Sequence, residues 1–461
     1  MPPYVPSARQ IWLTEAAIKP LPTRETLFTP TSLGGRIPRS GRDGLVVLCI
    51  DIPTSPSFPH LLPPSTILHL PLHLNPASTV HHPSLAITNP IPNPSPPIMS
   101  QTMKAVIFDG IKSVSIQERP IPTILEPTDA ILQVTLTALC GSELHVFRGH
   151  QKSATGFIMG HEFTGTVVEV GTAVTKFKKG DTVVSPFTTS CGECFYCTNQ
   201  LSSRCAQVKL FGCPLLDGGQ AEYVRVPLAD GTLFSVPSSI EPENVILMAD
   251  IFPTGFFAAK NAFASLPASK HSESVAVVIG CGPVGLCAIV AALEYKPKKL
   301  FVIDSVASRL EQAARLGDVV VPLNFAAEGG VAAVKEAILA ETEQRGADVV
   351  MEVVGLSPAL RTAFEIVRPF GMISSVGVHN AEIPITGNEA YGKNVKLQFG
   401  RCPVRAMFDE ALPVLAKNQE KLKFMTALVE PLENAVEMYR LFDEMKVQKV
   451  VFKTDAYKGS K

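Results

Sequence analysis

The stretch VAVVIGCGPVG, residues 275–285, decides the fold. Its first five residues form an apolar run of strand length, and a glycine-rich turn follows that opens a helical stretch. In a dinucleotide-binding turn the first glycine permits the bend, the second lets the backbone approach a pyrophosphate, and the third allows close packing of helix and strand. A chance glycine-rich turn is the alternative, because GxGxxG alone is a weak pattern. The context favours a cofactor-binding turn built from Gly280, Gly282, Pro283, Val284 and Gly285.

The next predicted strand, LFVID, ends at Asp304, 19 residues beyond Gly285. A carboxylate at this position accepts hydrogen bonds from the adenosine ribose hydroxyls and repels a 2′-phosphate. The predicted cofactor is therefore NAD rather than NADP. The alternative is that Asp304 is an ordinary turn residue at a strand end. Arg309 lies nearby and is interpreted as a solvent-facing helix residue.

Apolar strands and helical stretches alternate from residue 275 onward, through LFVID, ASRLEQAARLG, ADVVMEVV, LRTAFEIVRP and MISSVGV. This alternation predicts an α/β fold with a doubly wound parallel sheet. Upstream, from Met103 to about residue 228, the chain is rich in short β-type runs such as AILQVTLTAL, FTGTVVEVG, DTVVSP and AEYVRVP. A second, β-rich domain is therefore expected before the parallel sheet.

Composition excludes several classes of protein. The chain has 461 residues, 46% of them hydrophobic, and a formal net charge of -1, so no electrostatic argument favours nucleic acid as a partner. No uninterrupted apolar run approaches the roughly 18–20 residues that span a bilayer, and no membrane association is expected. The ten cysteines, with no export signal, favour a reducing compartment, which we expect to be the cytoplasm.

Residues 1–98 differ in composition from the rest of the chain, because they hold 20 of its 39 prolines. Frequent proline fixes φ and removes backbone donors, so a disordered, proline-rich extension is predicted here rather than a domain. Five arginines suggest a mitochondrial transit peptide as one alternative. A leader outside the mature protein is another, because Met99 and Met103 offer starts.

The segment CGECFYCTNQLSSRC places four cysteines within fifteen residues, spaced C-x2-C-x2-C-x7-C. In a reducing compartment such a cluster indicates a metal site or a redox site rather than disulfides. Cys213 lies just beyond the cluster and is interpreted as a spare, structural cysteine. The four clustered residues are Cys191, Cys194, Cys197 and Cys205.

Several motifs follow one another along the chain: CGSELH (140–145), GHEFTGTVVEVG (160–171), the four-cysteine segment, DIFPTG (250–255) and GCGPVG (280–285). Together they resemble the zinc-dependent medium-chain alcohol dehydrogenases over about residues 103–455. DIFPTGFFAAKNAF and SSVGVHN (374–380) look most like the formaldehyde-dehydrogenase-like branch. The resemblance implies a GroES-like β-barrel catalytic domain plus a Rossmann doubly wound parallel sheet, and a homo-oligomer, either dimer or tetramer.

The resemblance also implies domain bounds. Residues 99–252 would form the first part of the GroES-like catalytic domain, with a structural zinc lobe at about 190–206. Residues 253–390 would form the Rossmann NAD-binding domain, and residues 391–461 would return to the catalytic domain.

Two zinc ions per chain are implied. Four thiolates fill a tetrahedral shell, so a closed, structural site would use Cys191, Cys194, Cys197 and Cys205. A catalytic site keeps one position open for substrate and would use three protein ligands. In this resemblance they are Cys140, His161 and Asp250, where aspartate stands in place of the cysteine of some members.

Further roles come from the same resemblance. Ser142 would take the substrate proton and pass it, through the nicotinamide ribose, to His145, and Glu162 would tune the catalytic metal. An ordinary surface histidine and a structural ion pair are the alternatives for His145 and Glu162. Glu143 stands where many relatives carry an aspartate that supports the zinc-binding histidine, and its extra methylene leaves that contact open. Implied cofactor contacts are Thr254 on the nicotinamide ring, Val376, Gly377 and Val378 at the carboxamide, and Lys449 at the pyrophosphate.

The expected function is a zinc-dependent NAD oxidoreductase that interconverts an alcohol and an aldehyde or ketone by hydride transfer. Formaldehyde and small primary alcohols are the candidate substrates. A polyol or amino-alcohol dehydrogenase of the same superfamily, a zinc-free relative resembling quinone reductases, and a non-catalytic NAD-binding scaffold are the alternatives. The intact set of Cys140, Ser142, His161 and Asp250 favours a working enzyme.

Overall fold

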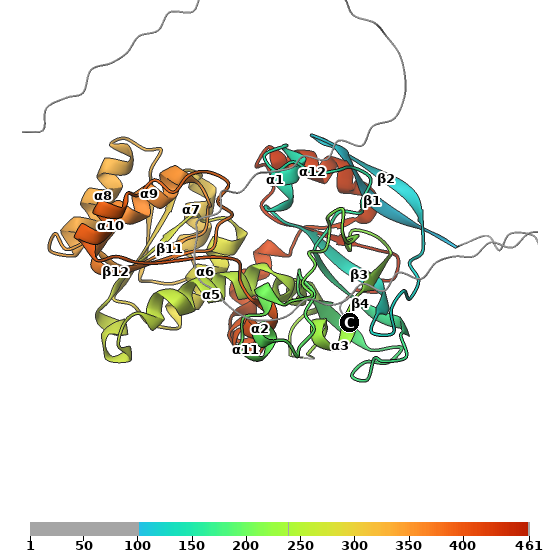
Figure 1. Cartoon of the computed structure of the whole chain (residues 1–461). Helices are drawn as coiled ribbons and strands as arrows, with labels where there is room; N and C mark the ends of the chain where they lie inside the picture. Colours follow the sequence, from blue (N-terminus) through green and yellow to red (C-terminus); the bar gives the residue numbers. More distant parts are fainter. Residues whose placement is uncertain (1–100, 238, 460–461) are drawn as a thin grey trace, which may run out of the picture. The chain divides into compact units, whose positions relative to one another are not determined.

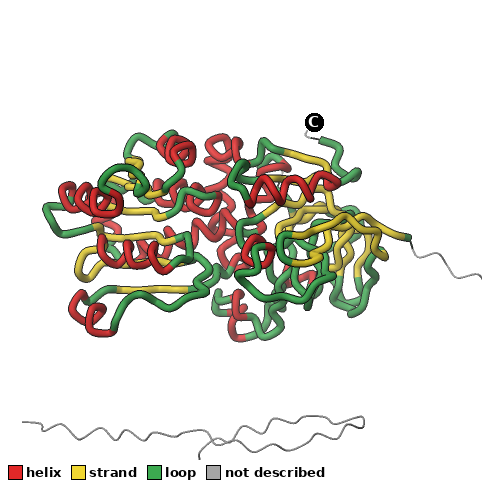
Figure 2. The backbone as a smooth tube through the Cα atoms, turned by 90° about the horizontal axis from the view of Figure 1, so that it is seen from above, coloured by secondary structure: helices red, strands yellow, loops and turns green. Residues whose placement is uncertain are grey.

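The computed structural model describes residues 101–237 and 239–459. The predicted proline-rich extension, residues 1–98, lies outside these described residues. Within them the strands form a six-stranded sheet, a seven-stranded sheet and a two-stranded ribbon. Figure 2 shows the strands in yellow, the helices in red and the loops in green. No helix in the two described ranges has the length and apolar character needed to cross a membrane.

The six-stranded sheet is parallel throughout, and we call it the Rossmann sheet. Its strands are β8 (Val275–Ile279), β9 (Lys299–Asp304), β10 (Val320–Asn324), β11 (Ala347–Glu352), β12 (Val367–Ser375) and β13 (Lys396–Phe399), in the spatial order β10-β9-β8-β11-β12-β13. The order reverses beside β8, the strand that leads into the glycine-rich turn. In such sheets ligands bind outside the carboxyl ends of the strands at this reversal.

Helices cover both faces of the Rossmann sheet (Figure 1). They are α5 (Ile251–Ala264), α6 (Pro283–Leu293), α7 (Ala307–Ala314), α8 (Gly330–Glu341), α9 (Ser357–Ile366) and α10 (Gly387–Lys393). Along β8, Ala276 and Val278 pack in one core with α5 and α6, whereas Val275, Val277 and Ile279 pack in another with α8 and α9. A strand buried on both faces is apolar throughout, which explains the run VAVVI.

One strand of the Rossmann sheet, β13, lies beyond residue 390, the predicted end of the Rossmann domain. Strand β13 pairs in parallel with β12 and belongs to the same sheet. It lies at the sheet edge with most of its residues exposed, so its sequence, KLQF, lacks the apolar run that marks the inner strands.

The seven-stranded sheet carries the β-rich part of the chain. Strand β3 (Ala130–Leu139) is its centre and pairs antiparallel with β4 (Glu162–Val170), β6 (Tyr223–Val226) and β15 (Val450–Lys453). The other members are β5 (Thr182–Ser185), β7 (Phe234–Ser235) and β14 (Val429–Pro431), and β1 (Thr102–Gly110) with β2 (Ser113–Pro120) forms the separate ribbon. Because β15 pairs with β3, the end of the chain returns to the domain in which the described residues begin.

The remaining helices are short connectors or belong to the returning segment. The α-helices are α1 (Glu143–Phe147), α2 (Phe195–Thr198), α3 (Ala229–Thr232), α4 (Pro242–Val245), α11 (Val404–Leu422) and α12 (Ala435–Asp443). The 3-10 turns are η1 (Ser202–Arg204), η2 (Ile246–Ala249), η3 (Ala268–Glu273), η4 (Lys423–Met425) and η5 (Leu432–Asn434).

Candidate active site

Three distant segments bring the predicted catalytic ligands together. Cys140 follows β3, His161 precedes β4, and Asp250 is the N-cap of α5. The Cys140 sulfur lies 3.8 Å from Oδ2 of Asp250, and Nε2 of His161 lies 3.4 Å from the same oxygen. One ligand atom from each of these residues and Glu162 lies within 4.8 Å of the others. Sulfur, imidazole and carboxylate donors in this arrangement fit a zinc ion with a position left for substrate.

The charges of this cluster favour a bound cation. Burial raises the pKa of the Cys140 thiol, and the neighbouring Glu162 carboxylate raises it further. Burial by itself would lower the pKa of His161, but the Cys140 sulfur and the surrounding acceptors raise it well above its ordinary value. Burial by itself would raise the pKa of Asp250, but hydrogen bonds from His161 and Thr254 lower it, so a carboxylate is available to face a cation. A metal ion bound here would displace the proton of the Cys140 thiol and leave a thiolate ligand.

A second layer of side chains fixes His161. Its Nδ1 lies 3.1 Å from Oε1 of Glu143, so the longer carboxylate does reach the histidine. Oε2 of Glu143 accepts hydrogen bonds from the Cys140 amide (3.2 Å), the Gln220 side chain (3.2 Å) and the Tyr439 hydroxyl (3.3 Å). Such contacts orient a ligand ring and set its tautomer.

Glu162 forms a buried ion pair with Lys449, and both side chains are almost fully enclosed. The Lys449 ammonium thus contacts the Glu162 carboxylate, beside the predicted metal ligands. The contact of Lys449 with a pyrophosphate stays a prediction. Oε1 of Glu162 is buried without a hydrogen-bond partner among the described residues. An unpartnered carboxylate oxygen at this place fits the predicted role of Glu162 near a metal.

The predicted proton-transfer residues lie on the same short stretch. Oγ of Ser142 is 3.4 Å from the Cys140 sulfur and 3.4 Å from Nε2 of His161, so the hydroxyl faces the ligand cluster. His145 lies one helical turn further, on α1. Burial lowers the pKa of His145, and the neighbouring His150 and Arg148 lower it further, so its imidazole is neutral near pH 7.

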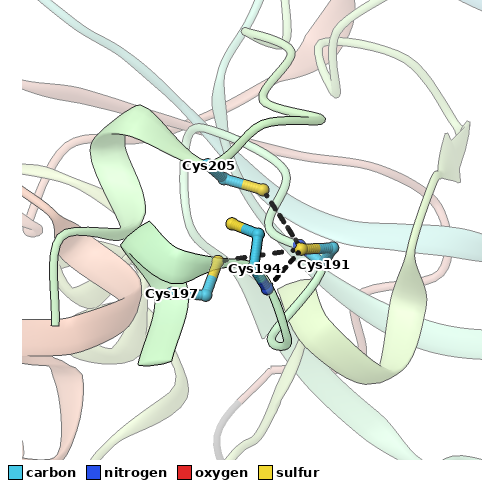
Figure 3. A group of neighbouring side chains, drawn as sticks. All are labelled: Cys191, Cys194, Cys197 and Cys205. Atoms are coloured by element: carbon cyan, nitrogen blue, oxygen red, sulfur yellow. Dashed lines mark hydrogen bonds between the residues drawn. The ribbon is translucent and has the colours of Figure 1, made fainter. Parts of the chain in front are cut away.

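The four-cysteine segment forms a compact lobe in which all four side chains converge (Figure 3). The Cys191 sulfur lies 3.5 Å from that of Cys205 and 4.0 Å from that of Cys197. Sulfurs bound to a tetrahedral zinc at about 2.3 Å are about 3.8 Å apart, so the spacing fits a metal shell. The nine cysteines among the described residues are all free thiols. Backbone N–H groups of Ala206 and Cys197 lower the pKa of the Cys194 thiol to about 6.

The glycine-rich turn has the backbone that a cofactor requires. Gly280 has φ +99°, and a Cβ on Gly285 would lie 1.8 Å from the carbonyl oxygen of Gly280, so neither position accepts a side chain. A Cβ on Gly282 would meet nothing within 4 Å, which leaves open space beside the turn. Pro283 and Val284 begin α6. Oδ2 of Asp304 accepts a hydrogen bond from the Cys281 amide at 2.8 Å, which places the predicted ribose-binding carboxylate against the turn.

The predicted nicotinamide contacts lie at two places near this turn. The Thr254 hydroxyl donates to Oδ1 of Asp250 at 2.7 Å, so it also orients a predicted metal ligand. Val376, Gly377 and Val378 directly follow β12, and the Val376 amide donates to the Glu352 carbonyl oxygen at 3.0 Å. The backbone of this loop is thereby held at the carboxyl end of the Rossmann sheet.

Comparison with known proteins shows the family. Residues 126–238 match the family "Alcohol dehydrogenase GroES-like domain", and residues 283–417 match "Zinc-binding dehydrogenase". The chain is 58% identical, over 76% of its length and 81% of the relative's, to "Zinc-type alcohol dehydrogenase B" of Aspergillus flavus. It belongs to the zinc-type medium-chain alcohol dehydrogenases. Membership makes the chain a zinc-dependent alcohol oxidoreductase that uses NAD or NADP.

Other members of the family agree with this assignment. "Medium chain reductase/dehydrogenase ucsI" of an Acremonium species is 56% identical over 64% of this chain and 100% of that protein. Among solved structures, "Alcohol dehydrogenase TADH from Thermus sp. ATN1" superposes with a TM-score of 0.70 at 34% identity and covers 76% of this chain and all of that one. The predicted fold, a GroES-like domain plus a Rossmann domain, is confirmed.

Sequence reasoning missed several side chains of this alcohol dehydrogenase. Gln220 and Tyr439 support Glu143 from segments far away in the sequence, and no motif marks them. The centroid of the Phe187 ring lies 6.1 Å from that of the His161 ring. The Arg401 guanidinium lies over the same Phe187 ring, 5.8 Å from its centroid. Only the position of Phe187 just after a strand of the β-rich part hinted at a site residue.

Proposed function

We propose that this alcohol dehydrogenase oxidises formaldehyde, as its hydrate or thiol adduct, or small primary alcohols with NAD. One observation supports a joint zinc and cofactor site. Of two consecutive residues, the first contacts the glycine-rich turn and the second contacts the predicted zinc-ligand cluster. The Gln448 side chain donates to the Cys281 carbonyl oxygen at 3.2 Å, and Lys449 pairs with Glu162. The glycine-rich turn and the ligand cluster are therefore neighbours, as hydride transfer from a metal-held alcohol requires. The DIFPTGFFAAKNAF segment supports the formaldehyde-dehydrogenase-like branch.

The chemistry that zinc and NAD supply when bound is activation of an alcohol oxygen and acceptance of hydride. Cys140, His161 and Asp250 would hold the metal, and Glu143 would hold the His161 ring in position. Ser142, at the ligand cluster, would take the hydroxyl proton of the substrate. His145 is uncharged near pH 7 and would receive that proton on its way to water.

NAD is the proposed cofactor, because the buried Asp304 carboxylate lies against the glycine-rich turn and would repel a 2′-phosphate. NADP is the second candidate, and one observation favours it. Arg309, interpreted from the sequence as solvent-facing, is half-buried and lines a surface cavity of about 270 Å³ together with Val306 and Lys446. Two cations beside the strand end that carries Asp304 would suit an additional phosphate.

Two zinc ions per chain are proposed, one in the ligand cluster and one in the cysteine lobe. We further propose a dimer or tetramer in the cytoplasm, where a reducing medium keeps the lobe thiols available for metal. The exposed edge strand β13 supports association through the Rossmann sheet.

The deciding experiment is NAD(P)H formation with formaldehyde (with and without glutathione), primary alcohols, secondary alcohols and polyols offered side by side. Turnover of formaldehyde or small primary alcohols with NAD is expected. Preference for a polyol or a secondary alcohol would reject the proposed branch and keep the zinc chemistry. Preference for NADP, abolished in Arg309→Ala, would reject the cofactor assignment.

A further inference from the structure

A buried acidic group that none of the predicted roles uses lies at the carboxyl end of β11. The Glu352 side chain is fully enclosed and accepts four hydrogen bonds. Its Oε1 accepts from the Val354 and Gly355 amides, each at 2.8 Å, and its Oε2 accepts from the Ser375 hydroxyl at 2.6 Å and from His379 Nε2 at 3.0 Å. A carboxylate without solvent needs such donors, so each of them matters to its charge.

These bonds join two loops at the edge where the nicotinamide is proposed to lie. Residues 353–355 follow β11, and residues 376–379 follow the neighbouring β12. The loops touch closely: a Cβ on Gly377 would lie 2.1 Å from the Gly355 amide nitrogen. Ser375 and His379 also contact each other at 2.9 Å, so the carboxylate, the hydroxyl and the imidazole form one closed group.

The loop that follows β11 also packs against the glycine-rich turn. A Cβ on Gly280 would lie 2.7 Å from a methyl group of Val354, and the Val353 amide donates to the Ile279 carbonyl oxygen at 3.1 Å. On the other side, the Phe399 ring meets the His379 ring edge-on at a centroid distance of 5.6 Å and restricts its rotation. Glu352 therefore lies directly behind the backbone that would face the cofactor.

We propose that Glu352, Ser375 and His379 are positioning residues that hold the backbone of Val376–Val378 in place for the nicotinamide carboxamide. The inference rests on the proposed NAD site. A group that acts only on this loop affects the nicotinamide end of the cofactor and leaves the adenosine and pyrophosphate contacts intact. A group that merely completes the core would weaken binding of the whole cofactor, or only the stability of the fold.

The test compares NADH with ADP-ribose, which lacks the nicotinamide, by calorimetric titration of the full chain. In Ser375→Ala and His379→Ala we expect NADH to bind about tenfold more weakly, because each variant removes a hydrogen bond to the buried carboxylate. ADP-ribose binding should stay within about twofold of the unaltered protein, since its contacts lie elsewhere.

A matched control is Ser374→Ala. Ser374 is also buried on β12, but its hydroxyl has no hydrogen-bond partner among the described residues, so NADH binding should not change. Equal weakening of both ligands, or unchanged NADH binding in both Ser375→Ala and His379→Ala, would overturn the inference. If the unaltered protein bound neither NADH nor ADP-ribose, the proposed NAD site itself would fail. His379 is the least buried member of the group, so its variant serves if Ser375→Ala does not fold.

Discussion

The two candidate zinc sites of this alcohol dehydrogenase differ in how the chain builds them. The cysteine lobe takes all four ligands from residues 191–205, and three of them are partly exposed. The catalytic cluster takes Cys140, His161 and Asp250 from three elements and encloses them with charged and polar partners. Because its four cysteines lie close together in the sequence, the lobe could bind a metal with few contacts to the rest of the protein. The predicted catalytic site forms only when the GroES-like domain and α5 are both in place.

The largest expected effect breaks the catalytic site alone. Cys140→Ala should reduce zinc content from two ions per chain to one and lower turnover by at least about 1,000-fold, because metal activation contributes several kcal/mol to the barrier. Elemental analysis and steady-state rates measure this. Cys213→Ala is the matched control, since its thiol donates a hydrogen bond to the Leu210 carbonyl oxygen and is not a member of either ligand cluster. Retention of two zinc ions in Cys140→Ala would contradict the assignment.

The complementary change breaks the lobe alone. Cys194→Ser should remove the other zinc and lower the free energy of unfolding by about 4 kcal/mol, as loss of a structural metal does. The catalytic zinc should remain. In unaltered protein treated with a chelator, Cys194 should be the first thiol alkylated above about pH 6 and should lose that reactivity below it, because its pKa is about 6. Alkylation mapped by mass spectrometry decides the point, and uniform labelling of the four cysteines would speak against it.

A smaller effect concerns protons at the catalytic site. Turnover should fall as the pH drops through the pKa of His145, which burial and nearby cations place below its ordinary value, since only the neutral imidazole accepts the proton. His145→Gln should remove this acidic limb and lower the rate by about 100-fold. His150→Gln should keep the limb and move its midpoint upward, because it removes a like charge. An unchanged pH profile in His145→Gln would leave His145 as a surface histidine.

The smallest expected effect concerns the support of His161. Glu143→Gln should weaken zinc binding at the catalytic site by about 10- to 100-fold, because the ring loses a charged partner at 3.1 Å. Competition with a chelator measures this affinity. Glu444→Gln, an exposed carboxylate that pairs with Arg440, is the control and should have no effect. Equal zinc affinity in both variants would show that the longer carboxylate gives no support.

Strand and helix assignments in the Rossmann domain came directly from the sequence, because strands buried on two faces are apolar throughout and glycine marks the turn. The prediction missed β10, α8 and β13, whose residues are half exposed and show no clean periodicity. The lobe ligands were equally plain, since C-x2-C-x2-C-x7-C is a local spacing. The sequence did not indicate the cavity beside Arg309, because residues 424–449, far along the chain, complete it.

By itself the sequence determined what is local: the glycine-rich turn, the cysteine lobe, the alternation of strands and helices, and the motifs that carry the family resemblance. Only the tertiary structure decided what depends on distant contacts. It set the reach of Glu143 to His161, the burial of Lys449 against Glu162, and the closed group of Glu352, Ser375 and His379. The physical reason is the range of each interaction. Backbone geometry and ligand spacing act over a few residues, whereas buried charges are satisfied by whichever side chains the packed sheets bring beside them.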